Sequence, residues 1–122
     1  MDYKPTVVFD FDGVIHSYTS GWKGVTKIPD PPCTGIKQAI QELRDEGYRV
    51  VVVSTRGETD EGRVAIYRYL NKWDIVVDDV SATKPPALCY IDDRAIRFDG
   101  DAYKLKEEII NFKTWIEKEG DK

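Results

Sequence analysis

The sequence is poor in cysteine and histidine and has no long apolar run, and these shortages exclude several classes of protein. Two cysteines among 122 residues are too few for a disulfide framework, and their spacing matches no metal-ligand motif. A reduced, cytoplasmic protein is therefore expected. No apolar stretch approaches the roughly 20 residues that a membrane span needs, and the first residues carry no apolar signal segment. We expect no membrane partner.

An excess of basic residues is also missing, since the formal net charge is −4 at pH 7. The global charge thus points neither to nucleic acid nor to an anionic membrane. Charged residues make up 33% and hydrophobic residues 41% of the chain, which is typical of a folded soluble domain and argues against disorder. The length fits one domain, and we expect a single hydrolase-like domain over residues 1–122.

Short apolar, β-branched runs alternate with helical patterns along the chain. The runs lie at residues 6–9, 49–53, 74–77 and 88–91. Continuous apolar stretches of this kind are typical of strands that are covered on both faces, as in a parallel sheet.

Helical periodicity fills the intervals between these runs. One helical face is formed by Ile36, Ala39, Ile40 and Leu43. Thr34 is expected to cap this helix and Gly47 to end it. A second helix is predicted from 60 to about 72, and a third after Asp101, with an inward row of Leu105, Ile109, Phe112 and Ile116. The order predicts an α/β fold: a Rossmann-like, doubly wound, mainly parallel sheet with helices on both faces and no separate cap domain.

Residues 14–32 interrupt this rhythm between the first strand and the first helix. The interval is long for such a connection, and glycines and prolines punctuate it. We expect a flap or short hairpin there, too small to be a domain. His16 is expected to pack within this segment, a catalytic role being the less favoured alternative. Trp22 fits either a contact with substrate or a hydrophobic anchor.

Two carboxylates stand where the first strand ends. Asp10 follows the strand directly, Asp12 lies two residues on, and Gly13 allows the backbone to bend. Ligands of open α/β sheets bind beyond the carboxyl ends of the strands, so both side chains are expected at that edge. A carboxylate at the strand tip can attack phosphorus, and a second one can act as acid and base. Taken alone, the pair is equally compatible with a structural turn cap.

Later strand ends carry further polar groups. Ser54, Thr55 and Arg56 follow the run at 49–53, and Lys84 precedes two prolines in an extended loop. Asp92 and Asp93 follow the run at 88–91. Adjacent carboxylates repel each other unless a cation neutralises them, and hard oxygen ligands at such a site favour Mg²⁺.

The order of these motifs, hhhDxDG, then hhhSxR, then Lys, then hhhDD, resembles the haloacid dehalogenase superfamily from residue 7 to about 100. The resemblance implies that Asp10 is the nucleophile and Asp12 the general acid and base. It implies that Ser54, with Thr55 as competitor, and Lys84 bind the transferring phosphoryl group. The implied ligands of Mg²⁺ are Asp10, the backbone carbonyl of Asp12, and Asp93, with Asp92 as direct or water-mediated partner.

This resemblance implies a magnesium-dependent phosphomonoester hydrolase that works through an aspartyl-phosphate. Dehalogenases proper lack the second aspartate and related ion-pumping ATPases carry threonine there, so Asp12 favours ester hydrolysis. A phosphorylatable receiver domain is disfavoured because its acidic pair comes first in the chain. A non-catalytic phosphate-binding protein with the same fold stays open as the alternative.

The substrate is not defined by these motifs. An open site without a cap is similar to that of members acting on macromolecular ends, and residues 51–56 and 91–94 look like the phosphatase domain of polynucleotide kinases. The candidate substrates are therefore a phosphorylated small molecule, a nucleotide and a nucleic-acid 3′-phosphate, although the net charge argues against binding of nucleic acid. An oligomer is another way to close the site. Arg56 and Arg94 are expected either to contact substrate phosphates or to pair with neighbouring carboxylates.

Overall fold

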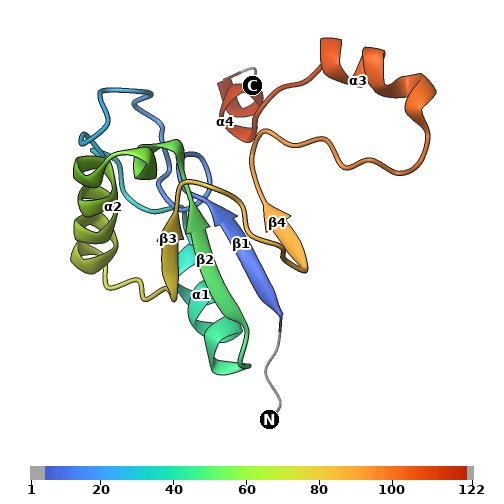
Figure 1. The fold of residues 1–122 in the computed structure, drawn as a ribbon. Coiled ribbons are helices and arrows are strands. Elements are labelled where there is room, and N and C mark those ends of the chain that lie inside the picture. The colour runs from blue at the N-terminus through green and yellow to red at the C-terminus, as the bar shows by residue number, and fades with distance from the viewer. Residues whose placement is uncertain (1–4, 121–122) are drawn as a thin grey trace.

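The computed structural model describes residues 5–120, in which a four-stranded parallel sheet is accompanied by helices (Figure 1). The strands lie in the order β3-β2-β1-β4. The two central strands are β1 (Thr6–Asp10) and β2 (Arg49–Val53), and the edges are β3 (Asp79–Ser81) and β4 (Cys89–Ile91). All three strand pairs are parallel. This confirms the prediction of an α/β fold built on a Rossmann-like parallel sheet.

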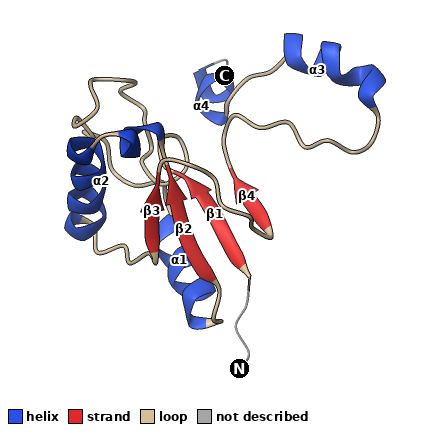
Figure 2. Cartoon of the chain, viewed as in Figure 1, coloured by secondary structure: helices blue, strands red, loops and turns tan. Residues whose placement is uncertain are grey.

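The two helices expected between the strands are confirmed. Helix α1 (Ile36–Asp45) connects β1 to β2, and α2 (Asp60–Lys72) follows β2 after the short 3-10 helix η1 (Thr55–Glu58) (Figure 2). Thr59 caps α2, because its Oγ1 accepts a hydrogen bond from the Gly62 N–H at 3.1 Å. These crossovers place both helices between consecutive parallel strands.

The start of α1 differs from the prediction. Gly35, with a φ of +84°, stands at the N-cap, and no side-chain hydrogen bond caps the helix. The expected cap at Thr34 is therefore wrong, because the chain enters the helix through a left-handed residue that only glycine adopts at little cost. Gly47 follows the end of the helix with a φ of +95°, as predicted.

The third strand lies further along the chain than predicted. The run at 74–77 is the exit of α2, since Asp74 has a φ of +57° and the Ile75 N–H donates to the Leu70 carbonyl at 2.8 Å. Ile75 is buried in the core, so its apolar character reflects packing and not strand pairing. Pairing with β2 begins only at Asp79, and the prediction of a strand at 74–77 is wrong.

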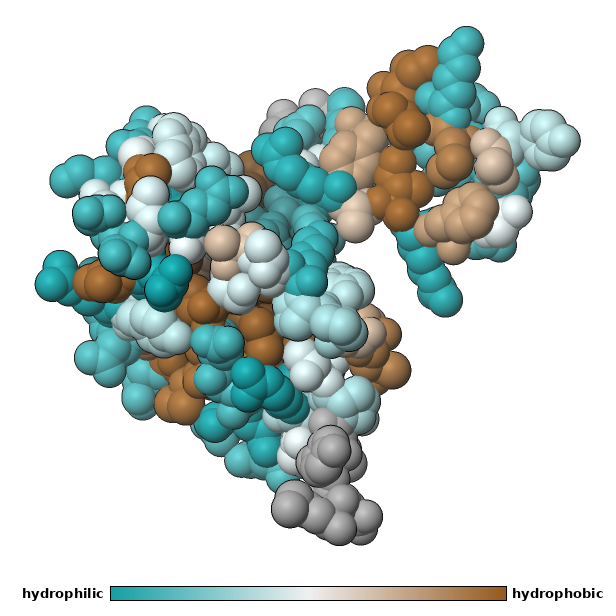
Figure 3. All heavy atoms as spheres, viewed as in Figure 1, coloured by the Kyte–Doolittle hydropathy of each residue, from teal (hydrophilic) through white to brown (hydrophobic). Residues whose placement is uncertain are grey.

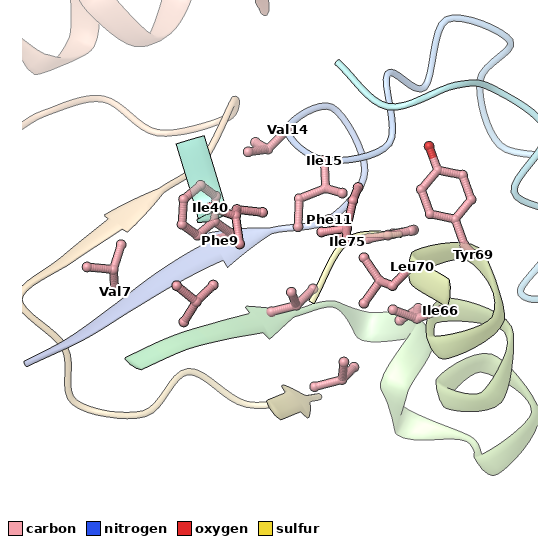
Figure 4. Packing of buried hydrophobic residues seen from close by; sticks show 13 residues of the cluster. Val7, Phe9, Phe11, Val14, Ile15, Ile40, Ile66, Tyr69, Leu70 and Ile75 are labelled. Carbon is pink, nitrogen blue, oxygen red and sulfur yellow. The ribbon is translucent and has the colours of Figure 1, made fainter. Parts of the chain in front are cut away.

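The main core lies between the sheet and the two helices (Figure 4). Its buried members are Val7, Phe9, Phe11, Val14, Ile15, Ile40, Val50, Val52, Ile66, Tyr69, Leu70, Ile75 and Val80. The opposite face carries a small cluster of Val8, Val51 and Val53, which packs with Ala87 from the connection between β3 and β4. Within residues 5–120, the expectation of helices on both faces is thus met on one face only.

The segment that was expected to form a flap or hairpin is an irregular loop. Its pairing is limited to two isolated bridges among the described residues, Asp12 with His16 and His16 with Pro32. Asp30 is buried and accepts hydrogen bonds from the backbone N–H and the hydroxyl of Ser20, at 2.8 and 2.5 Å. These internal contacts order the loop without forming a hairpin.

The C-terminal part does not form the single amphipathic helix that was predicted. It contains the 3-10 helix η2 (Ala102–Lys104), α3 (Leu105–Ile110) and α4 (Trp115–Gly120), with a break at 111–114. Helix α3 extends away from the sheet, and apolar side chains are visible on this part of the surface (Figures 1 and 3). Ile109 was expected to face inward, but it is 62% exposed. Among residues 5–120, no helix is both long and apolar enough to cross a lipid bilayer.

Candidate active site

Three carboxylates meet at the carboxyl edge of the sheet. Asp10 is the last residue of β1, and Asp92 and Asp93 directly follow β4. These strands are parallel neighbours, with Phe9 opposite Ile91, so their ends coincide. One carboxylate oxygen from each aspartate lies within 4.8 Å of the other two. We call Asp10, Asp92 and Asp93 the acidic triad.

Burial and crowding oppose the ionisation of two members of this triad, Asp10 and Asp93. Burial raises the pKa of Asp10 to about 7, with further contributions from the charge of Asp92 and the contact with Asp93. Burial also raises the pKa of Asp93, and its buried Oδ1 has no hydrogen-bond partner among the described residues. A cation would reduce the repulsion between the carboxylates and would give Asp93 Oδ1 a partner. The donor set therefore fits Mg²⁺, which prefers carboxylate oxygens.

Because Gly13 has no side chain, the loop after β1 leaves room for the carboxylate of Asp93. Its φ is +86°, and a Cβ at this position would stand 2.1 Å from Asp93 Oδ2. Any side chain here would displace the carboxylate. The Gly13 carbonyl accepts a 2.7 Å hydrogen bond from Trp115 Nε1, so a residue of the C-terminal segment braces the same loop.

The carboxylate of Asp12 points to a different set of partners. It receives hydrogen bonds from Arg56 Nε at 2.9 Å and Arg56 Nη2 at 3.2 Å, and His16 Nδ1 lies 2.8 Å away. Burial by itself would raise the pKa of Asp12, but the hydrogen bonds from His16 and Arg56 outweigh it and hold the pKa below its ordinary value. Asp12 is therefore held as a carboxylate outside the acidic triad, and the metal role expected of it rests on its backbone carbonyl.

Arg56 is a buried structural partner in this arrangement. It is 1% exposed, and besides its two bonds to Asp12 it donates from Nη1 to the carbonyls of Gly24 and Val25, both at 2.7 Å. The ring of Trp22 lies over the guanidinium, 4.5 Å from Cζ to the ring centroid. Of the two alternatives for Arg56, the ion pair is confirmed. A substrate contact by Arg56 stays a prediction that nothing in the structure tests.

His16 is fully buried and its hydrogen bonds define its tautomer. The backbone N–H of Asp30 donates to Nε2 at 3.1 Å, so Nδ1 carries the proton and donates it to Asp12. The ring also stacks on Phe11 and meets Tyr69 edge-on. The expected packing role is confirmed, and the contact with Asp12 adds to it. In the sequence, the spacing of four residues between Asp12 and His16 was the signal that could have indicated this contact.

Ser54 and Thr55 lie at the tip of β2, beside Asp10. Asp10 is paired in register with Val53, so Ser54 follows at the next position along the edge. Ser54 is buried and its Oγ accepts the Arg56 N–H at 3.1 Å, while Thr55 is exposed. A hydroxyl that accepts one hydrogen bond can still donate its own proton. Which hydroxyl binds phosphate stays a prediction.

Lys84 approaches the same edge from the connection between β3 and β4. Its Nζ lies 3.5 Å from Asp92 Oδ2 and 5.6 Å from the centroid of the Tyr90 ring. Arg94 is exposed, and its backbone N–H donates to Asp92 Oδ1 at 2.8 Å. The structure thus brings Lys84 to the acidic triad, and it leaves the Arg94 side chain at the surface.

Trp115 is the residue of this site that sequence reasoning missed. Its neighbours in the sequence suggested only an amphipathic helix, and its partner Gly13 is 102 positions away. A contact at that separation leaves no periodic pattern, so the sequence carried no signal for it.

Comparison with known proteins supports the fold. No family model matches the chain, and no curated protein matches it. Among solved structures, the chain is similar to a chain of the Pnkp1/Rnl/Hen1 complex and to one of the Pnkp1/Rnl/Hen1 RNA repair complex, each with a TM-score of 0.53 and 19% identity. The matches cover 91% and 94% of this chain. It spans 35% of each matched chain, and at this identity the likeness shows a shared fold alone.

Proposed function

We propose that this chain is a magnesium-dependent phosphomonoester hydrolase of the haloacid dehalogenase type, with Asp10 as the nucleophile. The observation that carries the proposal is the acidic triad, in which oxygens of three aspartates lie within 4.8 Å of one another at the ends of two parallel strands. Lys84 stands 3.5 Å from this group, so cationic and anionic side chains converge where a phosphate would bind. A purely structural turn would not be expected to gather three carboxylates, two of which, Asp10 and Asp93, have raised pKa values.

In the first half-reaction an oxygen of Asp10 forms a bond to phosphorus as the bond to the leaving oxygen breaks. Ser54 and Lys84 hold the phosphoryl oxygens, and Asp12 gives a proton to the departing alcohol. Asp10, Asp93 and Asp92 would hold Mg²⁺, together with the backbone carbonyl of Asp12. When bound, the ion supplies neutralisation of charge on the carboxylates and the phosphoryl group.

In the second half-reaction Asp12 takes a proton from water, which attacks the phosphorus of the aspartyl-phosphate and regenerates Asp10. The observed arrangement favours this step, because Arg56 and His16 hold Asp12 as a carboxylate. Protonation of Asp12 for the first step requires these donors to be weakened or displaced. The proton that Asp12 gives up in one step returns in the other, so no net proton is consumed at this residue.

The test is turnover of a panel of phosphomonoesters with Mg²⁺ by the wild type and by Asp10→Asn. Wild-type turnover that is lost in the variant, with an unchanged circular dichroism spectrum, supports the proposal. A covalent phosphate on Asp10, trapped by rapid acid quench and located by peptide mass spectrometry, would identify the intermediate. Turnover by purified Asp10→Asn protein would contradict the assignment of Asp10 as the nucleophile.

A second candidate is dephosphorylation of nucleic-acid ends. The solved structures with a similar fold include a chain of an RNA repair complex, which supports this candidate. The net charge of −4 weighs against tight binding to a polyanion. Including 3′-phosphorylated oligonucleotides in the same panel, at low and high salt, separates the two candidates. A preference for oligonucleotides that falls with salt would favour nucleic acid.

A further inference from the structure

A pocket opens beside the acidic triad, on the side away from Ser54. Gly13, Asp92 and Asp93 line one end, and its volume is about 730 Å³, within the range of small-molecule sites. It lies between the carboxyl ends of β1 and β4. From β1 the chain runs outward to β2 and β3 and then returns to β4 on the other side, so this crevice is where the strand order reverses. Open α/β sheets bind their ligands at this point.

Much of the remaining lining of the pocket is apolar. Val14, Pro31 and Pro32 come from the loop after β1, and Trp115 comes from α4. Figure 1 shows α4 near the ends of β1 and β4, in agreement with the hydrogen bond from Trp115 to Gly13. The indole therefore has a fixed orientation and is 37% exposed. A rigid aromatic face beside proline rings favours a planar guest, because aromatic rings pack best in offset or edge-to-face contact.

One buried polar group also lines this pocket. Ser17 is 8% exposed, and its Oγ is buried without a hydrogen-bond partner among the described residues. A buried hydroxyl without a hydrogen-bond partner destabilises the folded state, and such groups are rare in folded proteins. A ligand with a polar atom on the edge of its ring would satisfy it.

We propose that this pocket is the leaving-group subsite and that it accepts a planar aromatic group with a polar edge atom, carried by the alcohol of the phosphomonoester. The inference rests on the proposed function for its chemistry, because the phosphate would lie at the acidic triad and the ring would extend onto Trp115. Ser17 would then contact the edge of the ring. Trp115 and Ser17 act here as specificity residues for the substrate.

The test uses phosphonates, which bind without being hydrolysed, so that it does not depend on turnover. Benzylphosphonate and cyclohexylmethylphosphonate have similar size and charge but differ in planarity. We expect the wild type with Mg²⁺ to bind the aromatic probe about 3–10-fold more tightly by isothermal titration calorimetry. Trp115→Leu should remove this preference, and Trp115→Phe, which keeps a ring, should retain most of it. Trp73→Leu is the matched control, because Trp73, at the C-cap of α2 and not in the lining of this pocket, is also 37% exposed.

Ser17 is tested with a hydroxylated ring. The better of 3- and 4-hydroxybenzylphosphonate should bind the wild type more tightly than benzylphosphonate, and Ser17→Ala should abolish the difference. The same variant should be no less stable than the wild type, because it removes an unsatisfied buried hydroxyl. A merely structural serine would show the reverse, lost stability with unchanged selectivity.

Equal affinity of the wild type for the planar and the saturated phosphonate would overturn the subsite. A preference that survives in Trp115→Leu would likewise overturn the role of the indole. Failure of the proposed function is a separate result: the aromatic probe binds selectively, but no phosphomonoester in the panel is hydrolysed.

Discussion

Arg56 binds Asp12 in a bidentate manner through one edge of its guanidinium, Nε to Oδ2 at 2.9 Å and Nη2 to Oδ1 at 3.2 Å. The same side chain donates to the carbonyls of Gly24 and Val25, so it ties Asp12 to the more distant part of the loop after β1. One buried cation thus joins two parts of the loop that lie 31 to 44 positions before it in the sequence.

Arg56→Lys is expected to lower the free energy of unfolding by about 3 kcal/mol, since one ammonium cannot serve Asp12 and two carbonyls together. Urea unfolding followed by circular dichroism measures the change. The control is Lys37→Met, which removes an exposed pair with Asp74 and should cost at most about 1 kcal/mol. A loss as small as that of the control would show that the buried pair contributes little.

Gly13→Ala should weaken Mg²⁺ binding by about 10–100-fold, because its Cβ would stand 2.1 Å from Asp93 Oδ2 and displace the carboxylate. Isothermal titration calorimetry with Mg²⁺ measures the affinity. Gly100→Ala is the control for backbone strain, since Gly100 has a φ of +98° with nothing within 4 Å of its Cβ position. Equal metal affinity in the two variants would show that Gly13 has no specific role in Mg²⁺ binding.

Asp10→Asn should stabilise the protein in EDTA, and the gain should depend on pH. Burial raises the pKa of Asp10 to about 7, far above its value in the unfolded chain, so the folded state binds a proton that the unfolded state has lost. Without metal the carboxyl therefore costs stability progressively from about pH 4 to pH 7. The gain from Asn should be small near pH 4 and largest above pH 7, as thermal unfolding at several pH values would show. A gain independent of pH would mean that ionisation of the buried Asp10 carboxyl is not the cause.

Asp12→Asn should slow turnover of alkyl phosphates by about 10²–10⁴-fold, because a poor leaving group depends on the incoming proton. An aryl phosphate such as p-nitrophenyl phosphate leaves more readily and should keep more of its first-step rate. Pre-steady-state measurements on both substrates separate the steps. Small and equal losses on both would identify Asp12 as a structural residue held by Arg56 and His16.

The sequence by itself determined the central architecture and the residues at the strand ends. The apolar runs around Val8 and Val51 are short and rich in β-branched residues, which favours strands, and the residues around Ile40 have helical spacing, so β1, β2 and α1 were predicted correctly. Asp10, Asp92 and Asp93 follow such runs directly, and parallel pairing then brings them to one edge. Local patterns suffice where hydrophobic periodicity and strand direction fix the position of a side chain.

Only the tertiary structure decided which apolar residues pair and which polar residues meet. Ile75 lies in an apolar run, yet it joins the core while pairing starts at Asp79, because register with β2 selects a short edge strand. The contacts of Arg56 with Asp12 and of Trp115 with Gly13 join residues 44 and 102 positions apart. Such contacts depend on how loops pack over the sheet edge, and packing of distant segments leaves no periodic trace in a single sequence.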